Sequence, residues 1–293
     1  SFPLTADVNF ENLDLPPLVR AFREPPEHLA GRITGTFRAE GDTKNLKAIT
    51  LRGELTSLEA SIRSASVRTT GPAQFQYQNN VLRIDQLRLQ GPQLEFETSG
   101  TVRLGQEPLL NLNAKGQMDL AALGQADPQF ASSGKVQLDA QITGTGKNPL
   151  WRGNLLISDG SVHYGNLPNG FDRINGTVVF EGSRGILENV KAESGGGQLQ
   201  IGGFVSYGEG TGWQFNLTGD ATLVRIRYPE GLSTWVNGQL AWNGTIHSSL
   251  LEGRVALTRQ SVSPKFDLVR ALLSRKNERA AAAMPEVIRN MRL

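Results

Sequence analysis

The sequence contains no cysteine, only three histidines, and no apolar run long enough to span a bilayer. Without cysteine, a disulfide framework, a thiolate metal site and a cysteine nucleophile are excluded. The charges nearly balance, with 30 basic and 28 acidic residues, so no excess of positive charge favours nucleic acid. We therefore expect no nucleic-acid partner, and we expect any membrane anchor to lie outside this sequence.

Motifs that carry chemistry are also missing. Ser161-Val-His163 lacks the glycines of a nucleophile elbow, and His163 has no second histidine or carboxylate at a ligand-forming offset. Gly144-Thr-Gly-Lys147 is followed by Asn148 where a phosphate loop needs a hydroxyl, so it is interpreted as a hairpin turn. Gly195-Gly-Gly197 lacks the third glycine of a dinucleotide fingerprint. We predict no catalytic residue, no metal site and no cofactor, hence a protein that is not an enzyme.

What the sequence does contain is a repeat of about one hundred residues. One apolar-alternating element recurs at Leu4, Leu112 and Leu217, with separations of 108 and 105 residues. A second element recurs at Gly31, Gly134 and Gly238, with separations of 103 and 104 residues. Two independent markers at one spacing predict a stacked array, which presents a continuous surface rather than a single pocket.

Alternation of period two dominates the repeat. In residues 110–120 the apolar side chains share one face and Asn111, Asn113 and Lys115 share the other; residues 213–223 and 136–143 behave alike. Such one-sided strands favour antiparallel pairing. Seven strands are predicted within one period, at 136–143, 151–158, 161–164, 174–181, 186–192, 198–207 and 213–223. Asp159-Gly160 is interpreted as a turn between two of them, and Asn175-Gly176 as a turn or a bulge.

Two segments break the alternation. Residues 14–27, rich in proline, predict a short helical turn and a stiff connector, and residues after Pro264 have helical spacing and a basic composition. We interpret residues 1–30 as the end of a truncated repeat plus connector and 31–133 and 134–237 as two repeats. Residues 238–263 then start the next repeat, and 264–293 form a helical insertion or tail. We expect this to be part of a longer array.

The order of these segments is similar to that of the TamB family of translocation and assembly module subunits. The similarity is carried by an Asp-Gly strand (155–162), an Ile-x-Gly strand (171–180), a Gly-Gly-Gly strand (192–204) and a basic strand ending in Pro-Glu-Gly-Leu (224–232), which leads into residues 238–244. It covers about 134–263 most strongly, and the tail after Pro264 departs from it most. No single one of these motifs is specific.

This resemblance implies a protein anchored in the inner membrane that spans the periplasm of bacteria with two membranes, within the AsmA-like group of bridge-like lipid transfer proteins. It implies a curled β-trough with an apolar interior, linked to phospholipid movement toward the outer membrane. It also implies a role in outer-membrane protein assembly with a β-barrel partner of the TamA type. The family carries no catalytic residues to transfer.

The expected fold is therefore all-β: an elongated, curled, mainly antiparallel repeat sheet that forms an apolar trough, with a short helical C-terminal segment. Each CH₂ moved out of water gains about 0.8 kcal/mol, so an apolar trough would carry acyl chains that cannot cross water alone. The residues predicted to bind lipid in this trough are Phe2, Leu4, Val8, Phe10, Leu94, Phe96, Leu110, Leu112, Met118, Val136, Leu138, Ile142, Leu199, Ile201, Trp213, Phe215, Leu217, Leu223, Val236, Leu240 and Trp242.

Three other interpretations remain open from the sequence. The same side chains could fill a closed, packed core. The protein could act as a chaperone or assembly factor that receives unfolded outer-membrane strands at a sheet edge. It could also be a structural or adhesive β-repeat protein of the cell surface, although a solenoid would show a much shorter period.

Overall fold

A computed structural model describes residues 3–20, 24–25, 27–42, 45–62, 65–122, 129–165, 169–208, 210, 212–227, 231–262 and 291–292. The chain divides into two compact units, one of residues 1–126 and 137–153, the other of residues 127–136 and 154–293. Strands β9 (Phe130–Thr145) and β10 (Pro149–Tyr164) therefore contribute residues to both units. Each unit is described separately.

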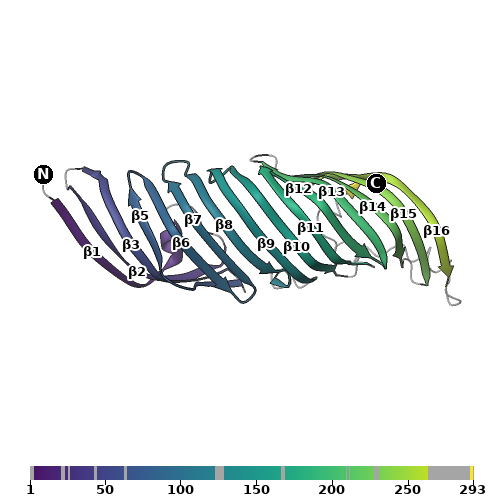
Figure 1. The fold of residues 1–293 in the computed structure, drawn as a ribbon, viewed down its shortest axis with the longest axis horizontal. Helices are drawn as coiled ribbons and strands as arrows, with labels where there is room; N and C mark the ends of the chain where they lie inside the picture. Colours follow the sequence, from purple (N-terminus) through teal and green to yellow (C-terminus); the bar gives the residue numbers. More distant parts are fainter. Residues whose placement is uncertain are drawn as a thin grey trace. The chain divides into compact units, whose positions relative to one another are not determined.

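The first unit is a meander in which most successive strands pair antiparallel, and Figure 1 shows β5, β6, β7 and β8 side by side. Its elements are β1 (Pro3–Asp14), α1 (Leu15–Arg20), β2 (Leu29–Asp42), β3 (Asn45–Ile62), β4 (Ala65–Thr69), β5 (Ala73–Gln78), β6 (Val81–Gly91), β7 (Leu94–Arg103) and β8 (Leu109–Asp119). Short α1 is the helical turn predicted before the connector, and it is confirmed. β4 and β5 both pair with β3 and with β6, so together they occupy one strand position.

The second unit is built in the same way. Its remaining strands are β11 (Phe171–Gly182), β12 (Arg184–Ser194), β13 (Gly197–Gly208), β14 (Gly212–Ile226), β15 (Leu232–Thr245), β16 (Ser249–Val262) and β17 (Met291–Arg292). The registers from β11 through β16 are antiparallel, and only the two-residue contact of β17 with β16 is parallel. The predicted all-β, mainly antiparallel fold is thus confirmed. The helix predicted in the tail lies outside the described residues, apart from 291–292, which form β17.

Bulges replace one of the predicted turns. Residues 151–158 and 161–164 belong to the single strand β10, so the prediction of a turn at Asp159-Gly160 is wrong. Asp159 has a φ of 49°, and its backbone N–H donates to Oδ1 of Asn175 at 3.0 Å. The register of β11 also shifts around Asn175, in agreement with the bulge interpretation of Asn175-Gly176. An extra residue is therefore accommodated within the pair of strands instead of ending one of them.

Three glycines mark equivalent places in the meander. Gly53, Gly153 and Gly253 recur at intervals of one hundred residues in β3, β10 and β16. At each of them a side chain would overlap the carbonyl oxygen of a residue on the neighbouring strand, namely Thr36, Asp139 and Gln239. Glycine is thus required where two backbones approach closely.

In the first unit, the strand registers sort side chains onto an apolar face and a polar face. Residues paired directly across strands lie on the same face. The apolar face contains two rows of paired residues: Val8–Phe37–Gly53–Phe75–Ile84–Gly100–Leu112 and Ala6–Ala39–Leu51–Tyr77–Leu82–Val102–Leu110. Glycines in these rows make room for rings, because a Cβ at Gly53 would lie 2.6 Å from the ring of Phe75.

The second unit has an apolar face of the same kind. Its paired rows are Val205–Phe215–Gly244–Ser249, Gly203–Leu217–Trp242–Leu251, Ile201–Gly219–Leu240–Gly253 and Leu199–Ala221–Gly238–Val255. The opposite, polar face is not purely polar, since Val179, Ile186 and Phe204 are paired with one another on it. The one-sided alternation of residues 110–120, 136–143 and 213–223 therefore does not extend to these three residues.

Large apolar side chains are not enclosed anywhere in the described part of the chain. No large side chain there falls below 2% exposure, and the buried apolar residues are all alanine or valine. A closed two-layer core would bury leucine and phenylalanine completely, because protein interiors are packed like crystals. Each unit therefore has one layer of sheet whose apolar face is only partly covered by its own side chains.

Candidate functional site

The residues predicted to line the apolar surface lie mostly on the apolar faces. In the first unit, Val8 and Leu112 share one row and Leu110 lies in the next. Phe96 pairs with Gly116 and Leu94 with Met118 on the same face. The predicted residues of this unit are half-buried except Val8, which is exposed: Leu4, Phe10, Leu94, Phe96, Leu110, Leu112, Met118, Leu138 and Ile142. Phe2 lies outside the described residues.

In the second unit, Leu199, Ile201, Phe215, Leu217, Leu240 and Trp242 come together on the apolar face, half-buried. Val136 and Val236 are buried, and Trp213 is 51% exposed. Leu223 is the exception, because a register shift between Ala221 and Val224 removes it from the alternation and leaves it 53% exposed with a φ of 54°. Val224, not Leu223, pairs with Val236. The prediction that Leu223 shares a face with Leu217 is therefore wrong.

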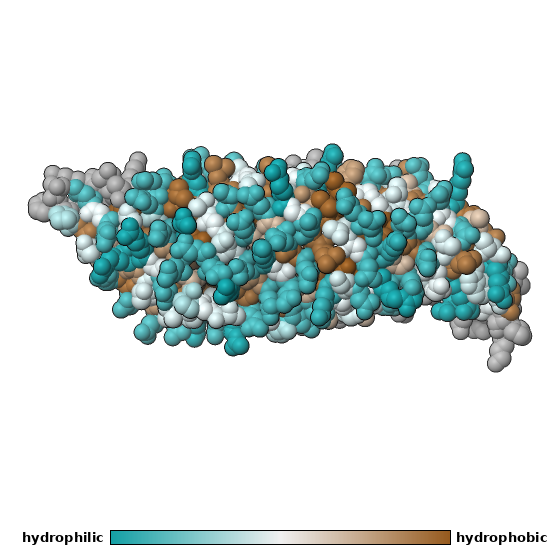
Figure 2. Space-filling view, viewed as in Figure 1, coloured by the Kyte–Doolittle hydropathy of each residue, from teal (hydrophilic) through white to brown (hydrophobic). Residues whose placement is uncertain are grey.

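Charged side chains on the polar face of the first unit form ion pairs between neighbouring strands. Arg88 Nε lies 3.1 Å from Glu97 Oε2, and Lys115 Nζ lies 3.1 Å from Asp139 Oδ2. Hydrogen bonds from Gln86 and Arg88 lower the pKa of Glu97 below its ordinary value. These groups are exposed, so each pair contributes little stability. They make this face hydrophilic. The side of the molecule seen in Figure 2 is mainly hydrophilic with small apolar clusters.

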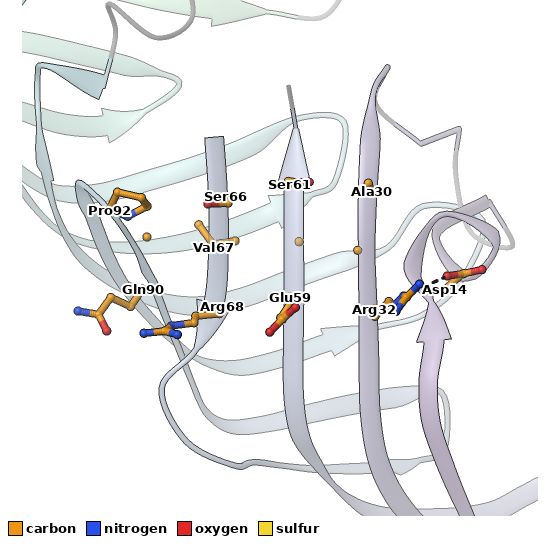
Figure 3. Close-up of a pocket in the computed structure, with 13 residues that line it drawn as sticks. Asp14, Ala30, Arg32, Glu59, Ser61, Ser66, Val67, Arg68, Gln90 and Pro92 are labelled. Carbon is orange, nitrogen blue, oxygen red and sulfur yellow. Dashed lines mark ion pairs between the residues drawn. The ribbon is translucent and has the colours of Figure 1, made fainter. Parts of the chain in front are cut away.

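The described cavities open on the polar faces, not on the apolar ones. One of them holds about 910 Å³ in the first unit, and Figure 3 shows residues from β2, β3, β4 and β6 across it. Asp14, Arg32, Glu59, Arg68 and Gln90 form one row of paired residues there, with Arg32 Nε 3.9 Å from Asp14 Oδ1. Because the charges in this row alternate and cancel, the cavity does not select an anion or a cation.

Two smaller cavities have similar linings. One of about 520 Å³ is bordered by Arg88, Glu97 and Lys115, and one of about 640 Å³ in the second unit by Asp220, Gln239 and Arg254. Of the residues predicted to bind lipid, only Phe96 and Leu240 border these three cavities. The surface predicted to bind lipid is thus a sheet face and not a cavity.

Ser161, His163 and Asp172 form a hydrogen-bonded cluster on β10 and β11. Ser161 Oγ donates to Asp172 Oδ1 at 3.0 Å, and His163 Nε2 lies 2.9 Å from the same oxygen. In a nucleophilic triad the histidine lies between serine and aspartate and removes the serine proton. Here the carboxylate lies between the other two, so this arrangement does not activate Ser161.

The hydrogen bonds from His163 and, second, from Ser161 lower the pKa of Asp172 below its ordinary value. We expect a carboxyl NMR titration to show this depressed pKa, and His163→Ala to raise it again, whereas His28→Ala should leave it unchanged. The stability that this ionisation contributes is present above the unfolded value of about 3.9 and is lost as the pH falls through the folded pKa. It is small because both side chains are about half exposed. An Asp172 pKa that is unchanged in His163→Ala would contradict this geometry.

Two groups of residues cannot be identified from the alternation of apolar and polar residues alone. Val179, Ile186 and Phe204 on the polar face each have an apolar neighbour in sequence: Phe180, Leu187 and Val205. Adjacent apolar pairs of this kind predict a strand with apolar side chains on both faces, and this was the available signal. The polar side chains buried within the second unit's apolar face, considered below, have no such signal, because only the registers reveal their surroundings.

Comparison of the chain with protein-family models, with curated proteins and with solved structures finds no match. None of the helices in the described ranges is long and apolar enough to cross a membrane. Within those ranges there is also no group of three or more histidine, aspartate or glutamate side chains placed to hold a metal ion.

Proposed function

We propose that this chain is a segment of a periplasm-spanning bridge that carries phospholipid acyl chains between the inner and outer membranes along the apolar faces of its sheet. In this proposal the intact protein is anchored to the inner membrane and meets a β-barrel partner of the TamA type at the outer membrane. The cellular location and the partner in this proposal come from the resemblance of residues 134–263 to the TamB family. The path proposed for the acyl chains is based on the partly exposed apolar faces of the sheet.

The observation that carries the proposal is the incomplete burial of large apolar side chains. Leu217, Phe215 and Trp242 lie together on the apolar face of the second unit, and none is enclosed. Burying the exposed remainder of such a face is favourable by about 25 cal/mol per Å², and extended apolar patches mark binding surfaces. An acyl chain gains about 0.8 kcal/mol for each CH₂ that it moves from water onto such a face.

Uniformity of the surface suits transport better than a tight site does. The paired rows run from strand to strand with leucine, valine, phenylalanine and glycine, and without a charge on the apolar face in the rows given above. An acyl chain that leaves one row therefore meets the same apolar chemistry in the next row. The ion pairs of the polar face remain in water throughout.

Gentle purification of the chain from a cell with two membranes, followed by lipid mass spectrometry, tests the proposal. We expect phospholipid bound at or above one molecule per chain, with mixed head groups and chain lengths. Only trace lipid, on a chain that is folded by circular dichroism, would count against transport along this face.

A second function is favoured by the edge strand β16. Among the described residues, β16 pairs with β15 along its length but with β17 only at Ser249 and Leu250. Val255 and Leu257 on its apolar face are 55% and 63% exposed. Such an edge is a template for strand addition, as a chaperone for outer-membrane strands would need. A lipid-free chain that captures an unfolded barrel protein, and loses this capture in Val255→Lys, would support that function instead.

A further inference from the structure

Two buried polar atoms without a hydrogen-bond partner interrupt the apolar face of the second unit. They are Nε1 of Trp242 and Oγ of Ser249. Ser249 is 4% exposed, and it is one of the two buried polar residues in the described part of the chain. An indole N–H only donates, and a hydroxyl donates and accepts, so both atoms are donors that lack an acceptor.

The registers place these atoms close together on one face. Trp242 pairs with Leu251, and Ser249, two residues away on β16, pairs with Gly244. Diagonal neighbours of this kind are about 7–8 Å apart, within reach of a tryptophan side chain. The surroundings are apolar: the ring of Phe215 lies 4.7 Å from that of Trp242. Gly244 has no side chain, and a Cβ there would lie 2.9 Å from that of Ser249.

Two other buried polar side-chain atoms in the described residues also lack a partner, Nε of Arg225 and Oδ1 of Asn243, and neither lies on the apolar face. Asn243 alternates with Trp242 and lies on the polar face. Arg225 stacks on Trp235, 4.8 Å from its ring centre, and pairs with it directly, so its Nε also lies on the polar face.

A buried donor without an acceptor costs about 1–3 kcal/mol, and native proteins leave few of them. Two on one apolar face imply that the ligand of this face brings the acceptors. Those acceptors are uncharged, because the described rows of this apolar face, given above, contain no cation to offset a buried negative charge. Tryptophan has the matching character, since its ring is buried in apolar material while its N–H reaches the polar boundary of a lipid layer.

We propose that Trp242 and Ser249 donate hydrogen bonds to the ester carbonyl oxygens of a diacyl glycerolipid lying on the apolar face. This inference rests on the proposed function and adds to it the atoms of the lipid that the face recognises. Acyl chains contact the neighbouring rows of leucine and phenylalanine, and the two donors fix the depth at which the chains join the glycerol. The site then distinguishes ester-linked lipids from ether-linked lipids, which lack the carbonyls.

The test is competition, on the full chain, between dipalmitoyl phosphatidylethanolamine and its dihexadecyl ether analogue. Each net hydrogen bond contributes about 0.5–1.5 kcal/mol, so we expect a preference of about tenfold for the ester. Trp242→Phe combined with Ser249→Ala removes the preference while the ether lipid binds as before. Trp235→Phe and Ser206→Ala, on the polar face, are the matched controls and should keep it.

A second readout is the infrared band of ¹³C-labelled ester carbonyls in the bound lipid. It should shift to lower frequency with the wild-type chain, and Trp242→Phe alone should reverse part of the shift. Equal binding of ester and ether lipid by the wild-type chain overturns this inference and leaves the proposed function standing. So does a preference that survives the double substitution. Binding of neither lipid overturns the proposed function itself.

Discussion

Leu217→Arg should strip phospholipid from the chain while leaving the chain folded, and Asn216→Arg should do neither. Leu217 lies half-buried on the apolar face between Gly203 and Trp242, whereas the adjacent Asn216 is exposed on the polar face. An arginine at 217 places a cation where acyl chains must pass, and an unpaired charge in apolar surroundings costs several kcal/mol. Since about 1.4 kcal/mol is a tenfold change, we expect bound lipid to fall at least about tenfold.

The stability of the same variant separates an open face from a packed core. On an open face the long arginine stem extends along the sheet and its guanidinium reaches water, so the fold tolerates it. In a closed core the guanidinium cannot reach water, so the chain should melt at a much lower temperature. Thermal melting and lipid content of Leu217→Arg and Asn216→Arg, measured together, decide between the two. Equal lipid on both folded variants would contradict lipid binding to this face.

The largest effect on stability is expected from Gly153→Ala. Gly153 has a φ of 144°, which L residues rarely adopt, and an added Cβ would overlap the carbonyl oxygen of Asp139 and lie 2.6 Å from Cα of Ala140. Both atoms belong to the neighbouring backbone and cannot rotate away. We expect the free energy of unfolding to drop by about 1–3 kcal/mol or more.

Gly146→Ala is the matched control, since nothing lies within 4 Å of a Cβ there. That substitution should leave the free energy of unfolding within about 0.5 kcal/mol of the wild-type value. Urea unfolding of the full chain, followed by circular dichroism, measures both. If the two variants unfold at the same urea concentration, that result contradicts the close backbone approach at Gly153.

Period-two alternation was sufficient to predict the all-β fold and most of the apolar face. It works because successive strand side chains point to opposite faces whatever the strand pairs with. Leu110, Leu112, Phe215 and Leu217 therefore lie on the predicted side. The recurring glycines Gly31, Gly134 and Gly238 added information, since they lie in the equivalent strands β2, β9 and β15, each facing a backbone carbonyl oxygen of the next strand.

The irregularities at Asp159 and Leu223 are what the sequence did not reveal. Asp159 and Leu223 both have positive φ, and their N–H groups donate to side-chain oxygens of Asn175 and Asn237. The acceptors are 16 and 14 residues away, so no local pattern identifies them. Asp159-Gly160 has the composition of a hairpin turn, and only the partner strand turns it into a bulge. The register shift between Ala221 and Val224 lets Val224, and not Leu223, continue the apolar face, which is why the prediction for Leu223 failed.

The central claim is that acyl chains contact one face of the sheet and not the other. It is tested most directly by photocrosslinking in living cells with p-benzoylphenylalanine at Leu112 or Leu217 on the apolar face, and at Asn111 or Asn216 on the polar face. We expect phospholipid adducts, identified by mass spectrometry, at Leu112 and Leu217, and none above background at the two asparagines. Adducts that are absent at Leu112 and Leu217, or equally abundant at all four positions, would contradict the account.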